Sequence, residues 1–87
     1  MNEQKQIWEE ITAYLSKESD VCSDPSMILE STNIRDDLNF DSLQAATMLM
    51  DLEDKFGIIV ETNFMNIKTV GDVFQLVLEA KYGKLVG

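Results

Sequence analysis

The sequence predicts an all-α fold, a small helical bundle with three longer helices and a long first loop. Apolar residues recur at helical spacing in three segments, and clusters of turn-forming residues separate those segments. The short β-branched run at 58–60 has no second strand with which it could pair, so we expect an extended link there. The 87 residues, 45% of them apolar, suffice for one modest core, so we expect a single domain over residues 1–87.

The first helix is expected over residues 3–17, because an apolar stripe formed by Ile7, Ile11, Tyr14 and Leu15 recurs on one helical face. Trp8 adjoins this stripe and is expected at the edge of the core. Residues 18–40 contain the only proline and many Ser, Asp, Thr and Asn residues, which predicts a long connection with a helical turn over 25–30. Five apolar side chains are expected to hold this loop on the bundle: Met27, Ile28, Leu29, Ile34 and Leu38.

The second helix is expected over residues 42–56, with Asp41 as N-cap and Gly57 as the C-terminal stop. Asn39 precedes it and tolerates a left-handed turn better than most residues. Ser42 then lies near unpaired N–H groups and the positive end of the helix dipole, where a phosphate ester is tolerated. The side chains expected to face inward are Leu43, Ala46, Leu49, Met50 and Phe56.

The last helix follows Thr69, which with Asp72 resembles a capping box, and Gly83 is its expected stop. A core-facing stripe recurs along this helix at helical spacing. Its members are Val70, Val73, Phe74, Val77 and Leu78.

Composition excludes several classes of function. Seven basic residues against 16 acidic ones give a net charge of −9, which disfavours nucleic acid and favours basic surfaces on partner proteins. The chain has no histidine and one cysteine, which excludes Ser-His and Cys-His nucleophile pairs and disulfides, so we expect neither an enzyme nor a metal site. No apolar run approaches the roughly 20 residues of a membrane span. No secretory signal is visible at the N-terminus, so we expect a cytoplasmic protein.

The triplet Asp41-Ser42-Leu43, together with the length, the acidity and the run at 52–57 that closes the helix, resembles the acyl carrier protein family. The resemblance implies a four-helix bundle whose short third helix covers 61–66. It also implies that Ser42 carries a 4′-phosphopantetheine arm, with Asp41 and Leu43 as motif neighbours, and that the arm's thiol holds acyl groups as thioesters. The implied partners are a phosphopantetheinyl transferase and acyl-loading and acyl-processing enzymes such as ligases, ketosynthases and acyltransferases. The carrier itself is expected to be a monomer.

The stretch 44–50 departs from this resemblance because it contains no charged residue, whereas common fatty-acid carriers place acidic residues there. We therefore predict a specialised carrier for secondary-metabolite or modified-lipid biosynthesis. Ala45 and Ala46 leave room for cargo near the arm, whereas Met50 is expected to fill the core. The predicted partner-binding residues are Asp41, Gln44, Thr47, Met48, Asp51, Glu53 and Asp54.

Three alternatives remain open from the residues. A peptidyl carrier has the same fold and arm, but differs in the residues immediately before its serine. Asp37, Asn39 and Asp41 match the first ligand positions of a calcium-binding loop, but Ser42 and Met48 stand where that loop needs glycine and glutamate. An acidic helical module that binds partners without a prosthetic group fits the composition equally well.

Overall fold

A computed structural model describes residues 3–21, 24–60 and 67–83 of the chain. Over these ranges the chain forms α1 (Glu3–Glu18), the single 3₁₀ turn η1 (Pro25–Met27), α2 (Ser42–Phe56) and α3 (Val70–Tyr82). The described residues contain no strand, only an isolated bridge between Asn33 and Thr69. The three longer helices of the predicted all-α fold are thus confirmed. The short third helix predicted for 61–66 lies outside the described residues.

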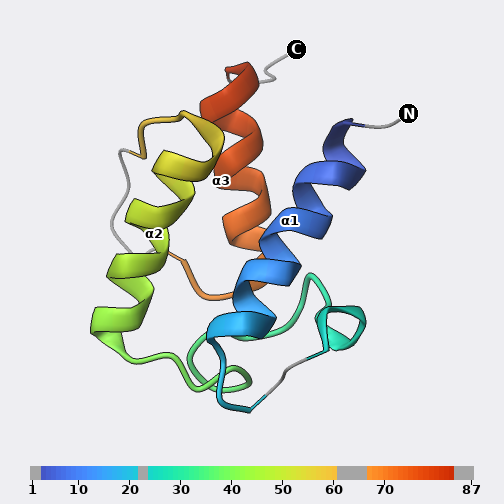
Figure 1. The fold of residues 1–87 in the computed structure, drawn as a ribbon, viewed down its shortest axis with the longest axis vertical. Coiled ribbons are helices and arrows are strands. Elements are labelled where there is room, and N and C mark those ends of the chain that lie inside the picture. Colours follow the sequence, from blue (N-terminus) through green and yellow to red (C-terminus); the bar gives the residue numbers. More distant parts are fainter. Residues whose placement is uncertain (1–2, 22–23, 61–66, 84–87) are drawn as a thin grey trace.

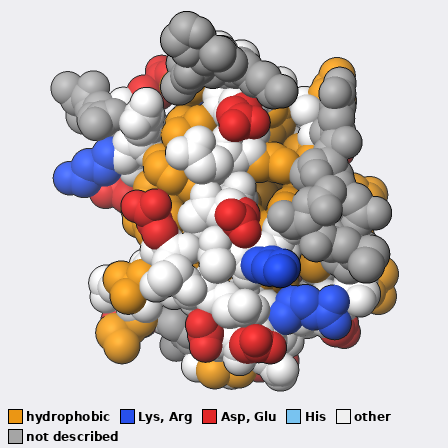
Figure 2. All heavy atoms as spheres, turned by 180° about the vertical axis from the view of Figure 1, so that it is seen from behind, with side chains coloured by type: hydrophobic (Ala, Val, Ile, Leu, Met, Phe, Trp, Pro, Cys, Tyr) orange, Lys and Arg blue, Asp and Glu red, His pale blue; other side chains and the backbone are white. Residues whose placement is uncertain are grey.

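The first loop joins α1 to α2 and crosses the end of the bundle where α1 ends and α2 begins (Figure 1). Its buried apolar side chains complete a core to which all three α-helices contribute. Figure 2 shows acidic side chains scattered over the opposite face of the molecule, with apolar side chains visible between them. The described core residues are Ile7, Ile11, Leu15, Ile28, Ile34, Leu38, Phe40, Ala45, Met48, Leu49, Leu52, Ile58, Ile67, Val70, Val73, Val77 and Leu78.

The predicted face of α1 is confirmed, since its three aliphatic members are buried and Tyr14 is half-buried. Trp8 lies at the core edge as expected. Its ring meets that of Phe74 on α3 edge-on, with centroids 5.3 Å apart. Such a contact stabilises the α1–α3 interface beyond its buried area.

The loop is held by fewer side chains than expected. Ile28, Ile34 and Leu38 are buried, but Met27 and Leu29 are 69% and 61% exposed, so the prediction for these two is wrong. Ile28 has an extended backbone, in which neighbouring side chains point to opposite sides. Because Ile28 points inward, Leu29 points to solvent, whereas Met27 belongs to the 3₁₀ turn η1, which has no buried residue.

The predicted inward face of α2 is also wrong in part. Leu43 and Met50 are 75% and 64% exposed, whereas Ala45, Met48 and Leu52 are buried along with Leu49. Ala46 and Phe56 are half-buried. Apolar residues occur on almost every side of this helix, so the sequence offers two competing stripes. The structure buries the stripe that contains Met48, and the one that contains Leu43 and Met50 faces solvent.

The start of α3 is fixed to the first loop by backbone hydrogen bonds. Val70 N donates to Thr32 O and Gly71 N to Glu30 O, both at 2.9 Å, and Ile34 N donates to Lys68 O at 2.9 Å. A Cβ added to Gly71 would lie 3.0 Å from Glu30 O, so only glycine permits this close approach without a shift. The contacts join the loop before α2 to the start of α3.

None of the helices within the described ranges is both long and apolar enough to cross a membrane.

Candidate functional site

The site begins with a tight turn that leads into α2. Asn39 has a φ of 61°, the left-handed conformation that asparagine was predicted to tolerate at this position. Phe40 follows with its side chain buried, and its N–H donates to Ile34 O at 3.1 Å. Phe40 was not among the residues predicted to be buried. This anchor holds the turn against the bundle and leaves the next residues, Asp41 and Ser42, exposed.

Asp41 caps α2 as predicted. Its Oδ1 accepts a hydrogen bond of 2.7 Å from Gln44 N, and Gln44 Oε1 accepts a longer one of 3.3 Å from Asp41 N. This reciprocal pair is a capping box. Gln44 was predicted only as a partner-binding residue, although its position three residues after the N-cap is the signal for a capping box.

Ser42 is the first residue of α2 and is exposed. The first N–H groups of an α-helix have no intrahelical acceptor, and the helix dipole places partial positive charge there. A phosphate ester on Ser42 Oγ would therefore lie where the backbone favours negative charge. The chain has no histidine and Asp41 Oδ1 accepts from a backbone N–H, so the site presents an accessible hydroxyl with no imidazole beside it.

The predicted partner-binding residues divide into three groups. Thr47 and Asp54 are exposed on α2. Four others make hydrogen bonds within the chain: Asp41 and Gln44 in the capping box, Asp51 with Tyr14, and Glu53, whose Oε2 accepts from Val60 N at 2.7 Å. Met48 is fully buried and therefore cannot contact a partner in this conformation, which corrects its assignment to the partner surface. Leu43 and Met50 occupy that exposed surface instead.

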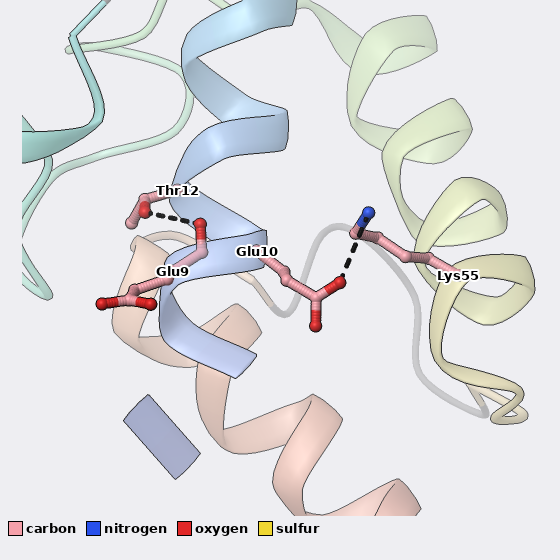
Figure 3. A network of polar contacts seen from close by, with 4 residues as sticks. All are labelled: Glu9, Glu10, Thr12 and Lys55. Atoms are coloured by element: carbon pink, nitrogen blue, oxygen red, sulfur yellow. Dashed lines mark hydrogen bonds and ion pairs between the residues drawn. The ribbon is translucent and has the colours of Figure 1, made fainter. Parts of the chain in front are cut away.

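Within the described ranges, a hydrogen bond and an ion pair join α1 to α2. Near the middle of α2, Tyr14 Oη donates to Asp51 Oδ2 at 2.6 Å. Burial, this hydrogen bond and the negative charges of Asp51 and Glu18 all raise the pKa of the Tyr14 hydroxyl, burial most strongly. Closer to the end of α2, Lys55 Nζ lies 3.6 Å from Glu10 Oε1, and both side chains are partly exposed (Figure 3). An exposed ion pair of this kind contributes little to stability, so the hydrogen bond from Tyr14 is the stronger of the two contacts.

The described residues hold no group of three or more side chains that could bind a metal. Asp37, the first residue of the calcium-loop alternative, accepts a hydrogen bond of 2.7 Å from Asn33 N in a turn. Asp41, at the fifth position, caps α2. Both carboxylates are thus used to shape the approach to Ser42.

Comparison with known proteins agrees with this geometry. A family model described as the phosphopantetheine attachment site matches residues 6–77. The chain belongs to the acyl carrier protein family. It is 43% identical over 68 residues to an acyl carrier protein of Exiguobacterium sibiricum, covering 77% of this chain and 78% of that one. It is 32% identical over 84 residues to that of Thermotoga maritima, covering 95% of this chain and 100% of the relative.

The fold agrees as well. A solved acyl carrier protein from Enterococcus faecalis superposes with a TM-score of 0.73 at 26% identity, over 88% of this chain and 96% of that one. Acyl carrier proteins bear 4′-phosphopantetheine on a serine and are carriers rather than enzymes. Family membership therefore contradicts the alternative of a module without a prosthetic group, and the relatives' names favour an acyl over a peptidyl carrier.

Proposed function

We propose that Ser42 is the serine that bears the 4′-phosphopantetheine arm of this acyl carrier. The observation that carries the proposal is its exposed position at the capped start of α2. Other serines in the described ranges suit the role less well, and Ser31, although exposed, lies outside the helices. Ser16 and Ser19 are buried and donate to Ala13 O and Leu38 O, and Ser26 donates to Asp24.

The residues around Ser42 fit the phosphate of the arm. The free N–H groups of the first turn favour its negative charge, and the capping box holds that turn in helical geometry before the arm arrives. Once attached, the arm supplies a terminal thiol that holds an acyl group as a thioester. The serine oxygen displaces the nucleotide portion of coenzyme A at phosphorus, and its proton passes to a base on the transferase.

Partner enzymes would meet the exposed side of α2 next to Ser42. We define the docking face as Leu43, Thr47, Met50 and Asp54, which fall on one side of the helix and are all exposed. Three of the four are uncharged, so apolar contact outweighs ion pairing on this face. This supports the hypothesis of a specialised carrier for secondary-metabolite or modified-lipid biosynthesis. Its partners would be a phosphopantetheinyl transferase, ligases, ketosynthases and acyltransferases.

The attachment site is tested by intact mass spectrometry after incubation with coenzyme A, Mg²⁺ and a broad-specificity phosphopantetheinyl transferase. We expect the mass to rise by one arm in the wild type and in Ser31→Ala, an exposed serine outside the helices, and to stay unchanged in Ser42→Ala. A rise in folded Ser42→Ala would contradict the assignment.

The specialised role is tested with the acyl-processing enzymes of a general fatty-acid synthase. We expect the wild-type carrier to be turned over more slowly than a standard fatty-acid carrier, and Thr47→Glu to recover part of the difference by restoring a charge to the docking face. Equal turnover of the wild type and the standard carrier would contradict the hypothesis of a specialised role. The matched control is Gln75→Glu, which adds the same charge at an exposed position on α3.

A further inference from the structure

A pocket of about 170 Å³ lies between α1 and the first turns of α2, at the edge of the docking face. It is smaller than the roughly 300 to 1,000 Å³ of sites that enclose a drug-sized ligand, so it suits the end of a side chain. Two docking-face residues belong to its wall. The lining residues are Tyr14, Glu18, Phe40, Leu43, Gln44 and Thr47.

The pocket combines fixed aromatic walls with an adaptable rim. Phe40 is buried in the core, and the ring of Tyr14 is held by the hydrogen bond from its hydroxyl to Asp51. Leu43 is 75% exposed and can cover an incoming group. Gln44 uses its Oε1 in the capping box, which leaves its side-chain N–H groups to face other partners. The site is therefore preorganised before anything binds.

The pocket is also acidic. Glu18 is part of its wall, and Glu18 and Asp51 are both close enough to the Tyr14 hydroxyl to act on it electrostatically. In the described part of the chain the recorded ion pair joins Lys55 to Glu10, so neither of these carboxylates is in ion-pair contact with a basic side chain there. With a net charge of −9, the chain as a whole attracts a cation toward this point.

We propose that this pocket receives an arginine side chain of the phosphopantetheinyl transferase while the transferase acts on Ser42. The proposal rests on the proposed function of Ser42. The transferase is the partner whose active site must reach the serine oxygen itself, and its surface therefore covers the first turns of α2. The arginine stem packs on Leu43 and Phe40, and its guanidinium stacks on Tyr14 and pairs with Glu18.

Arginine fits this pocket better than lysine. A guanidinium group is planar and weakly hydrated, so it can stack on an aromatic ring and enter a partly apolar pocket at low desolvation cost. Its several N–H donors can serve the Glu18 carboxylate and the Thr47 hydroxyl together. A lysine ammonium is a compact, strongly hydrated charge and gains less from the Tyr14 face.

The pocket chemistry is tested by following the backbone amides of the full chain by NMR at low salt. The probes are N-acetyl-arginine amide, its lysine counterpart and the neutral citrulline counterpart. We expect the arginine probe to shift Tyr14, Glu18 and Thr47 and to bind at least threefold more tightly than the others. Equal binding of either other probe, or shifts spread over all acidic residues, overturns the proposal.

Two variants on α1 each remove one negative charge. Glu18 lines the pocket, whereas Glu9 is exposed elsewhere on the helix. We expect Glu18→Gln to weaken binding of the arginine probe at least threefold and to raise the transferase KM for the carrier by a similar factor with kcat unchanged. Glu9→Gln should alter neither value. Equal effects of the two variants overturn the proposal, because they would show a response to net charge alone.

The attachment site and the arginine contact are tested by separate measurements. If the arm is added to Ser42→Ala as readily as to the wild type, Ser42 is not the attachment site. Mass spectrometry gives this result independently of the pocket. Normal loading at Ser42, combined with a transferase KM that ignores Glu18→Gln, overturns the arginine contact and leaves the attachment site standing.

Discussion

The starts of α2 and α3 have the same local chemistry but opposite surroundings. Each is closed by a capping box, Asp41 with Gln44 in one and Thr69 with Asp72 in the other. Inside the box, however, Val70 of α3 is fully buried, whereas Leu43 of α2 is 75% exposed. The α3 start also receives the first loop through hydrogen bonds from Val70 and Gly71. Local capping therefore determines where a helix begins, and tertiary contacts determine whether that end serves as an anchor or as a site.

The largest expected effect on stability comes from a buried residue in the middle of α2, compared with an exposed residue of the same type. Met48→Ala should lower the free energy of unfolding by about 2 to 5 kcal/mol, because a fully buried side chain leaves a cavity when truncated. Met50→Ala, at a position that is 64% exposed, should change it by less than about 0.5 kcal/mol. Urea unfolding followed by circular dichroism gives both values. Similar losses would mean that the assigned inward face of α2 is wrong.

Truncation at the two helix starts should give the next effect. Val70→Ala should cost about 2 kcal/mol of unfolding free energy, because it removes a fully buried side chain at the junction with the loop. Leu43→Ala should be nearly neutral by the same measurement. A destabilised Leu43→Ala protein would show that the docking face also contributes to the core, and the contrast between the two helix starts would fail.

Removing the N-cap side chains should instead cost the two helix starts a similar free energy of unfolding. Thr69→Ala and Asp41→Ala each take away an oxygen that accepts from the backbone of the first turn, so each should cost about 1 kcal/mol in thermal or urea unfolding. The exposed α2 start should show an additional loss of amide protection in hydrogen exchange confined to its first turn. Protection lost throughout the chain in Asp41→Ala would contradict the local role assigned to that cap.

The smallest expected effect is on the stability of the protein at acid pH. Hydrogen bonds from the backbone of Lys68 and Thr69 hold the pKa of Asp72 below its usual value. Because the folded pKa is depressed, this contribution to stability is fully present above the unfolded pKa of about 4 and is lost as pH falls through the lower folded value. Asp72→Asn should therefore be slightly less stable at pH 7 and show a shallower loss of stability below about pH 4. If the free energy of unfolding of Asp72→Asn decreases below about pH 4 as steeply as that of the wild type, the lowered pKa of Asp72 is contradicted.

The sequence predicted helix ends well because each end depends on local chemistry. Asp41, Gly57 and Thr69 carry their capping roles in residue type and spacing, and Gly57 indeed has a φ of 64°. The place of Ser42 at the start of α2 was predicted in the same way, whereas its role as the attachment serine came from the resemblance to acyl carrier proteins. The position of the attachment candidate therefore needed no tertiary information.

Which side of α2 is buried could not be predicted from local chemistry. The segment 44–50 is uncharged, so no polar face marks the solvent side, and Met48 and Met50 are equally plausible core residues until α1 and α3 are in place. The hydrogen bond from Tyr14 to Asp51 joins residues 37 apart in the chain. It shows why a carboxylate predicted to meet a partner is already engaged, and no local pattern signals it.

The different positions of the two methionines also determine how oxidants act on this carrier. A thioether at the surface is converted to the polar sulfoxide more readily than one enclosed by the core, so Met50 is oxidised before Met48. The first oxidative lesion on α2 thus changes the polarity of the docking face while the packing beneath it is intact. A carrier that remains folded, and still bears its serine, would lose recognition by its enzymes before it loses its structure.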